Sequence, residues 1–158
     1  MKKWILYIIA LGFSSYWASN LLLWFPWSYN PTLGITLMLT VVPLLWAYAT
    51  FLALKTYPNE GLLKGALQIA SIFLVLAVIL DYIFFGLIRN AMDDLYHPTT
   101  FYGYAFLVFW PLLLALIFRK NISQRKKDVT KTDFVRGGMF GLLCFGTVTL
   151  IILLRIEI

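Results

Sequence analysis

Long apolar runs, separated by short clusters of basic and turn-forming residues, constrain this chain more than any other feature. Hydrophobic residues make up 61% of its 158 positions, and the mean hydropathy is +0.84, more than a soluble domain needs. A helix that crosses a membrane needs about 20 predominantly apolar residues. The sequence therefore predicts one all-α integral membrane domain over residues 1–158, with five transmembrane helices.

The predicted spans are bounded by lysine or arginine and by proline, glycine and asparagine. They cover approximately residues 4–24, 31–54, 62–88, 99–118 and 137–154, and a basic loop over 119–136 separates the last two. The first span follows two lysines, as the apolar part of a signal peptide does. Its apolar stretch continues to Trp24 without a small-residue cleavage site, so we expect it to be retained as a span.

The distribution of positive charge predicts the orientation. Of the 13 lysines and arginines, only Arg89 and Arg155 fall on one side of the predicted spans, and the rest fall on the other. Positive loops stay in the cytoplasm, so we expect the N-terminus inside, the C-terminus outside, and loop 119–136 along inner headgroups of a bacterial cytoplasmic membrane. This loop accounts for most of the net charge of +6, so nucleic acid is not expected as a partner.

A weak repeat relates the first two spans to the third and fourth. Asn30 and His97 each precede a Pro-Thr pair that opens a span, and Pro43 and Pro111 each begin a later Pro-Leu-Leu stretch. Both hairpins run in the same direction, so the repeat would be parallel. Proline is favoured at the first helical position after an N-cap residue, whereas Pro43 and Pro111 should each remove one backbone hydrogen bond near mid-membrane.

Asp81 is the most informative single residue. It lies inside the third apolar run, eight residues before Arg89, which places it roughly 12 Å below the outer flank. A carboxylate there costs about 3 kcal/mol to insert, so it must face protein, water or a counter-charge rather than lipid. One interpretation is a proton- or cation-responsive functional group, and the other is a structural hydrogen bond between helices; we favour the first.

Counting depth from the membrane flanks suggests neighbours for Asp81. Asn20 lies at a similar height, Thr40 and Tyr104 fall in the outer halves of their spans, and Arg89 follows two turns later on nearly the same helical face. These five residues form the predicted ligand-binding set, around a polar cavity that opens outward. A threonine in a span can instead bond to its own helix, and an arginine can extend to the headgroups.

Asp93, Asp94 and His97 form the segment that most resembles a metal or acid–base site. The alternative is a solvated acidic turn in which His97 caps the fourth span and Asp93 pairs with Arg89 four residues earlier. The single histidine and the single cysteine, Cys144, exclude two-histidine and multi-cysteine metal sites. No catalytic constellation is recognisable, and the sequence predicts no metal and no cofactor.

Three hypotheses of function follow from these patterns. In the first, the outward-facing cavity binds and moves a small polar or amphipathic molecule, with proton coupling through Asp81. In the second, Asp93, Asp94 and His97 act on outer-leaflet lipid in a membrane enzyme. In the third, the chain is a non-catalytic accessory subunit. Five short helices bury little surface, so we expect membrane lipids and either further copies or a larger membrane protein as partners.

Overall fold

The computed structural model describes residues 1–124 and 128–154, and every regular element in these two ranges is helical. Part of the predicted basic loop, residues 125–127, and the outer-side Arg155 lie outside the described residues. In chain order the elements are α1 (Lys2–Tyr29), α2 (Pro31–Lys55), α3 (Leu62–Asp81), the π-helix η1 (Tyr82–Ile88), the 3₁₀ helix η2 (Met92–Tyr96), α4 (Pro98–Ile117), α5 (Arg119–Gln124) and α6 (Lys131–Leu153).

Five stretches are long and apolar enough to cross a membrane, which confirms the predicted all-helical, five-span composition. They are Lys2–Trp24, Pro31–Lys55, Leu62–Ile88, Pro98–Ile117 and Lys131–Leu153. The last begins six residues before the predicted boundary, because Thr130 and Asp133 form a reciprocal capping box that starts α6 inside the predicted basic loop. The short helix α5 also lies in that loop.

The two predicted helix caps are present. The Asn30 side chain accepts hydrogen bonds from the backbone N–H groups of Thr32 and Leu33 at 2.9 and 3.3 Å. His97 Nδ1 accepts from the N–H of Thr99 at 3.4 Å. Proline follows each cap at the start of its helix, as the sequence predicted. Pro43 and Pro111 lie inside α2 and α4; whether the two hairpins are a true repeat stays a prediction.

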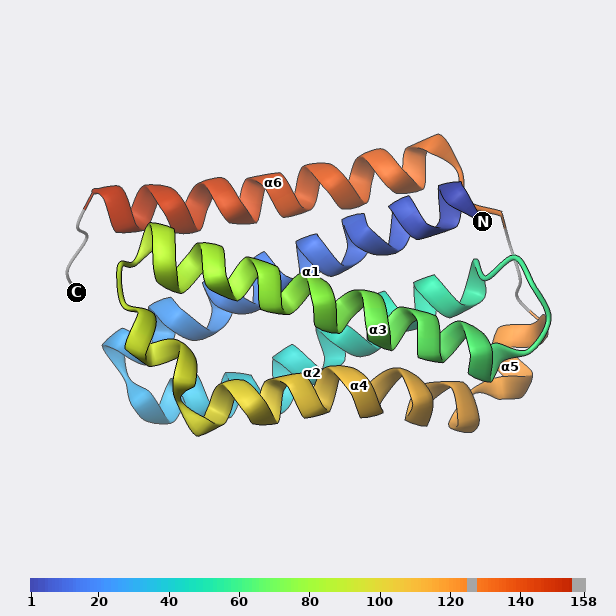
Figure 1. The fold of residues 1–158 in the computed structure, drawn as a ribbon, viewed down its shortest axis with the longest axis horizontal. Coiled ribbons are helices and arrows are strands. Elements are labelled where there is room, and N and C mark those ends of the chain that lie inside the picture. The colour runs from blue at the N-terminus through green and yellow to red at the C-terminus, as the bar shows by residue number, and fades with distance from the viewer. Residues whose placement is uncertain (125–127, 155–158) are drawn as a thin grey trace.

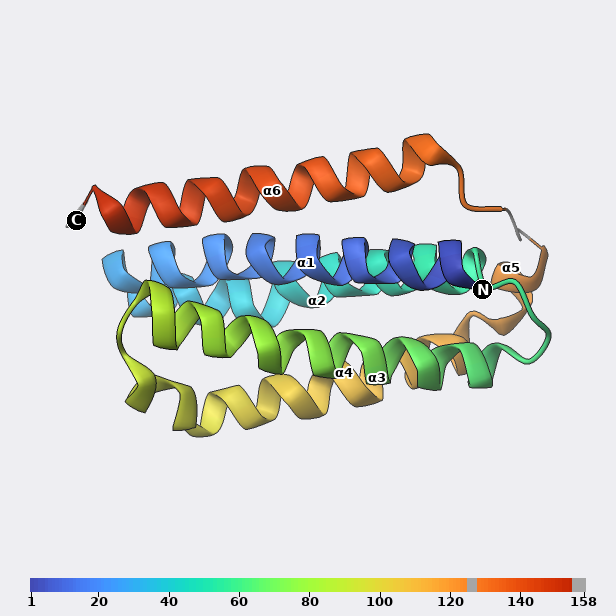
Figure 2. The same cartoon turned by 45° about the horizontal axis from the view of Figure 1, so that its top comes forward.

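Helix α1 occupies the middle of the bundle. It packs mainly against α2 and α6 and less extensively against α3, which in turn packs against α4 (Figures 1 and 2). The N-terminus, the α2–α3 connection and α5 lie at one end, which we call the basic end because Lys2, Lys3, Lys55, Lys64, Arg119 and Lys120 belong to it. The α1–α2 turn, η2 and the end of α6 lie at the opposite end, the far end.

Helix α6 is attached to the bundle through close contact with α1. An added Cβ at Gly141 would lie 2.7 Å from both a Phe13 ring carbon and Ser14 Oγ, so only glycine allows this approach. Ser14 Oγ also donates to the Gly137 carbonyl of α6. Small residues and interhelical hydrogen bonds hold helices together where lipid removes the hydrophobic difference between inside and outside.

Two tryptophans join α1 to α2. Trp4 Nε1 donates to the Ala53 carbonyl at 2.9 Å, and Trp46 Nε1 donates to Ser19 Oγ at 3.0 Å. One bond lies near the basic end and the other in the middle of the bundle. The pair therefore fixes the register of the two helices along their length.

The outward surface of the bundle is strongly apolar. Leucines such as Leu44, Leu87 and Leu153 are at least 70% exposed, together with many other large hydrophobic side chains. Such an extensive apolar surface would aggregate in water. Surrounded by acyl chains it is the expected exterior of a polytopic membrane protein.

Candidate functional site

The carboxyl group of Asp81 receives two hydrogen bonds from tyrosines on different helices. Tyr16 Oη donates to Oδ1 at 2.6 Å, and Tyr104 Oη donates to Oδ2 at 2.7 Å. Tyr16 belongs to α1, Asp81 is the last residue of α3, and Tyr104 lies near the start of α4. We call these three residues the Asp81 cluster; it joins three of the five spans through one side chain.

The cluster lies inside the protein. Asp81 and Tyr16 are only 8% and 6% exposed, whereas Tyr104 is half-buried. Within the described ranges no lysine, arginine or histidine comes within ion-pair distance of Asp81. The two hydroxyls are thus the polar groups that replace water around this carboxyl group, and Tyr104 is the more exposed of the two tyrosines.

The helix changes its geometry directly after Asp81. Residues Tyr82–Ile88 form a π-helix, and the wider turn continues with the Ala91 N–H donating to the Phe85 carbonyl at 2.8 Å. Asn90 then adopts φ of 51°, a left-handed conformation that asparagine tolerates better than most residues. Short π segments are rare in proteins, and those that do occur are frequently found at functional sites. Asp81 is therefore at the junction between a regular helix and a less regular one.

Aromatic rings surround the Tyr16 side of the cluster. The Trp17 ring lies 5.2 Å from that of Tyr16 and 5.9 Å from that of Phe84, both in edge-to-face arrangements. Phe84 comes from the π-helix and is buried at 1% exposure. The π segment thereby inserts the Phe84 ring against α1 one turn beyond Asp81, so movement of this segment would disturb the contact between Trp17 and Phe84.

Asn20 and Thr40 are not joined to Asp81 by a hydrogen bond. Asn20 Nδ2 donates to the backbone carbonyl of Tyr16 at 3.1 Å, so it lies one turn beyond the tyrosine that contacts the acid. Thr40 is exposed, and its hydroxyl donates to the Thr36 carbonyl of the same helix at 2.6 Å. The depth count thus selected the correct region of α1, but it missed the residue that makes the contact.

Arg89 is engaged at the far end of the bundle. Its Nη2 lies 3.0 Å from Oδ2 of Asp94, and its guanidinium carbon lies 5.8 and 5.4 Å from the ring centres of Phe84 and Phe85. The sequence suggested Asp93 as the partner on the assumption of a continuing α-helix. The π-helix and the reversal at Asn90 change that spacing, so Asp94 takes the position instead.

His97 is used by the fold as a helix cap. Its Nδ1 also lies 2.9 Å from Thr99 Oγ1, within the first turn of α4. Asp93 and Asp94 are both exposed. No group of three metal-ligating side chains occurs in residues 1–124 and 128–154. The segment thus forms a turn in which His97 caps α4, and an acid–base role for Asp93, Asp94 and His97 stays a prediction.

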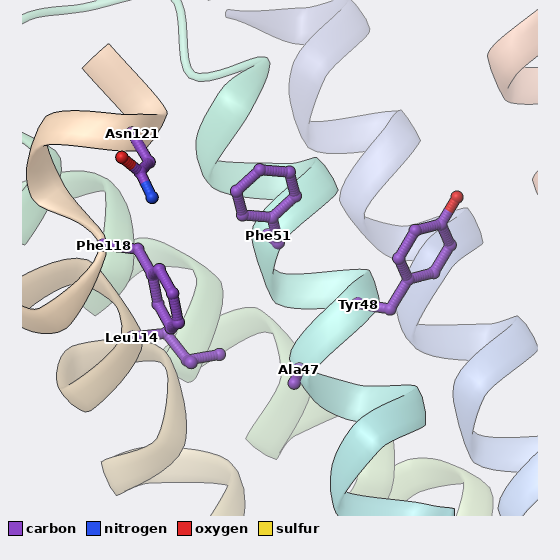
Figure 3. Close-up of a pocket in the computed structure, with 6 residues that line it drawn as sticks. All are labelled: Ala47, Tyr48, Phe51, Leu114, Phe118 and Asn121. Atoms are coloured by element: carbon purple, nitrogen blue, oxygen red, sulfur yellow. The ribbon is translucent and has the colours of Figure 1, made fainter. Parts of the chain in front are cut away.

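Two cavities lie elsewhere in the bundle, and Asp81 lines neither. One of about 360 Å³ is apolar and lies between α2 and the α4–α5 region (Figure 3), lined by Ala47, Tyr48, Phe51, Leu114, Phe118 and Asn121. The other, of about 310 Å³, lies between α1 and α3, lined by Trp4, Ile5, Lys64, Leu67, Gln68, Ser71 and Ile72. The outward-opening polar cavity at Asp81 stays a prediction.

Tyr16 is the cluster residue that sequence reasoning missed. Tyrosine prefers the headgroup layers of a membrane, yet Tyr16 lies in the middle of the first span, far from either flank. A hydroxyl at that depth needs a partner, and this signal could have paired it with the equally deep Asp81.

The chain matches no known protein family, no curated protein and no solved structure in the comparisons made.

Proposed function

We propose that this chain is a polytopic membrane protein that binds a small amphipathic molecule at the Asp81 cluster and couples that binding to a proton. The observation that carries the proposal is the buried carboxyl group held by Tyr16 and Tyr104 from two other helices. A ligand that displaced either hydroxyl would change the contacts between α1, α3 and α4. Binding at this point therefore affects three spans together.

The hydrogen-bond pattern supports a response to protons. An ionised carboxylate accepts hydrogen bonds at both oxygens, whereas a protonated carboxyl group carries one O–H donor. Both tyrosines donate to Asp81, an arrangement that fits the ionised form. When a proton binds one oxygen, the tyrosine facing it must turn to accept or must leave. Tyr104 is half-buried and has more space to move than Tyr16.

The surroundings favour a cationic ligand with apolar groups. Asp81 offers negative charge, the half-buried Tyr104 offers an aromatic ring, and a cation over such a ring is stabilised by its quadrupole. Arg89 already pairs with Asp94, so we do not assign it to the ligand. Exchange of a proton for a cation at Asp81 keeps the charge of the cluster constant, which gives the coupling a simple physical basis.

The orientation inferred from basic residues completes the proposal. With the basic end in the cytoplasm, Asp81 lies in the outer half of the bundle, one π-helix away from the far end. The π segment and Tyr104 would then form the route by which a molecule from outside reaches the carboxyl group. No catalytic step is required of any residue.

The test measures saturable binding of tetraphenylphosphonium, an amphipathic cation, to protein in lipid nanodiscs between about pH 5 and 8. The expected result is weaker binding at lower pH, together with release of a proton in weakly buffered solution at the acidic end of this range, where Asp81 carries a proton before the cation binds. Asp81→Asn should weaken binding at least about thirtyfold, because it removes one partner of a buried charge pair, and should abolish the proton release.

Tyr48→Phe is the matched control, since Tyr48 is 64% exposed on α2 and belongs to no part of the cluster. It should bind the cation as the unchanged protein does. Equal binding and equal pH dependence in the protein and in Asp81→Asn, with both folded by gel filtration, would show that the cluster is structural. Binding lost in both variants alike would also refute the assignment to Asp81.

An accessory role is the second candidate, and α6 favours it. This helix packs almost entirely against α1 and is the least buried of the five spans. Leu142 and Leu143 on it are 61% and 68% exposed. A partner helix could occupy the space beside α6; purification in a mild detergent with a stoichiometric second protein, lost on Leu143→Ala but kept on Leu87→Ala, would support this role.

A further inference from the structure

The cavity between α2 and α4, shown in Figure 3, lies at the opposite end of α4 from Tyr104. We call it the α2–α4 cavity. Helix α4 packs mainly against α3 and only lightly against α2. Pro43 precedes the lining residue Ala47 by one turn, and Pro111 precedes Leu114 in the same way. Proline removes a backbone hydrogen bond and bends a helix, so the two prolines favour a gap between α2 and α4 at this level.

The walls of the α2–α4 cavity change in character toward the basic end of the bundle. On α2, Ala47 and Phe51 are followed one turn later on the same face by Lys55. On α4, Leu114 lies one turn deeper than Phe118, which directly precedes α5. Both walls are therefore apolar toward the middle of the membrane and lead to polar residues at its surface.

Helix α5 forms the polar rim of the cavity. It contacts both α2 and α4, and Ile122, which is fully buried, anchors it to the bundle. Arg119, Lys120 and Asn121 are exposed in its first turn. Asn121 lines the cavity, and its amide group points from α5 toward it (Figure 3). In the described part of the chain no acidic side chain pairs with Arg119, Lys120 or Lys55, so the rim offers positive charge that is not neutralised.

We infer that the α2–α4 cavity holds an acyl chain of one anionic phospholipid, whose phosphate lies against the rim formed by α5. Acyl chains surround a membrane protein, so hydrocarbon is at hand to fill an apolar space between two spans. Arg119 and Lys120 attract the phosphate at the membrane surface, and the Asn121 amide donates to a phosphate or ester oxygen. Phe51 and Phe118 contact the chain below it. The basic rim thus selects which lipid places its chain in the cavity.

A spanning helix, from a partner or from a second copy, is too large for this space. A helix is about 10 Å across and rises about 5.4 Å per turn, so each turn occupies roughly 400 Å³. The whole cavity has a volume of about 360 Å³, which is less than one turn needs. The cytoplasmic flanks of spanning helices are also enriched in lysine and arginine, which the basic rim would repel. A single acyl chain is narrower and carries its negative charge at the right end.

The test uses native mass spectrometry of protein released from vesicles with equal amounts of phosphatidylcholine and phosphatidylglycerol. The unchanged protein should retain one phosphatidylglycerol in preference to phosphatidylcholine. Arg119→Gln combined with Lys120→Gln should reduce this retention at least about fivefold. The matched control combines Lys131→Gln with Arg136→Gln, which removes the same two residue types from exposed positions on α6 and should leave retention unchanged. Equal retention of both lipids, or equal losses in the two double variants, would overturn the proposal.

A further variant separates the role of the acyl chain from that of the phosphate. Ala47→Phe fills part of the cavity and should reduce retention about threefold, because a bound chain loses van der Waals contacts. Ala105→Phe, at an exposed position on α4, is its matched control and should change nothing. An excess of glycerophosphoglycerol, the same headgroup without acyl chains, should not displace the lipid.

Two results would replace the lipid by another occupant. Displacement by glycerophosphoglycerol, or retention that is lost in the α5 double variant and unchanged in Ala47→Phe, would overturn the proposal in favour of a site for soluble phosphate esters. A dimer that disappears with Ala47→Phe would overturn it in favour of a second copy. The α5 double variant changes only exposed side chains, so it tests the proposal whether or not Ala47→Phe folds.

Discussion

Tyr16 and Tyr104 lie on different helices, yet their hydroxyls donate to the two opposite oxygens of the same carboxyl group, at 2.6 and 2.7 Å. The acid between them is therefore a junction of α1, α3 and α4. Tyr16 is almost fully buried, whereas Tyr104 is half-buried. The two bonds are alike in length and differ in how far water or lipid can replace them.

This difference predicts unequal effects of removing each hydroxyl. Tyr16→Phe should lower the free energy of unfolding by about 1 kcal/mol, within the range of side-chain hydrogen bonds in membrane proteins, because nothing can replace the lost donor. Tyr104→Phe should lower it by less. Unfolding in mixed detergent micelles, with Tyr48→Phe as the exposed control, measures the difference. Equal losses for the two cluster variants would contradict it.

The close approach of α6 to α1 predicts a position-specific effect of adding a methyl group. Gly141→Ala should lower the free energy of unfolding by about 1 to 3 kcal/mol, since the new Cβ would meet Phe13 and the backbone of Ser14. Gly138→Ala on the same helix meets nothing within 4 Å and should be neutral or slightly stabilising. Thermal unfolding of both variants tests this, and equal stability would show that the helices separate easily.

The ion pair at the far end predicts a small, salt-dependent effect. Asp94→Asn should destabilise the protein by less than about 1 kcal/mol at low salt and by nothing measurable at high salt, because the side chains of Arg89 and Asp94 are 25% and 54% exposed. Asp93→Asn should have no effect at either salt concentration. The comparison of unfolding midpoints at two ionic strengths distinguishes the true partner from the neighbouring aspartate.

The inferred orientation predicts which connections an impermeant thiol reagent can reach. In a Cys144→Ser background, a cysteine at Tyr96, on the far end, should react in intact cells. A cysteine at Glu60, on the basic end, should react only after the membrane is permeabilised. Both native side chains are exposed, so accessibility depends on the membrane alone. The reverse pattern would place the basic end outside.

The sequence was sufficient for those features that depend on local patterns. Five spans follow from apolar length, and the caps at Asn30 and His97 follow from the Pro-Thr pairs behind them. The early start of α6 was missed because the charged residues around Thr130 and Asp133 resemble a loop, while their capping box is a helical signal.

Contacts between distant segments were harder to predict, for a geometric reason. Counting residues from the membrane flanks shows that Asp81 and this part of α1 lie at similar depths. It does not show which face of α1 points toward α3, so it indicates Asn20, whereas Tyr16 makes the contact. The π-helix changed the spacing after Asp81 and moved the partner of Arg89 from Asp93 to Asp94. The spacing of apolar residues in this segment gives no sign of the π-helix.

Because Tyr16 precedes Asp81 by 65 residues, the order of synthesis has a consequence for membrane insertion. Because α1 is synthesised before α3, the hydroxyl of Tyr16 can already be in the membrane when Asp81 is inserted. Asp81 then enters next to a hydrogen-bond donor, and the second donor, Tyr104, follows with α4. A chain rearranged so that the third helix emerged first would have to insert the same acid with no donor to receive it.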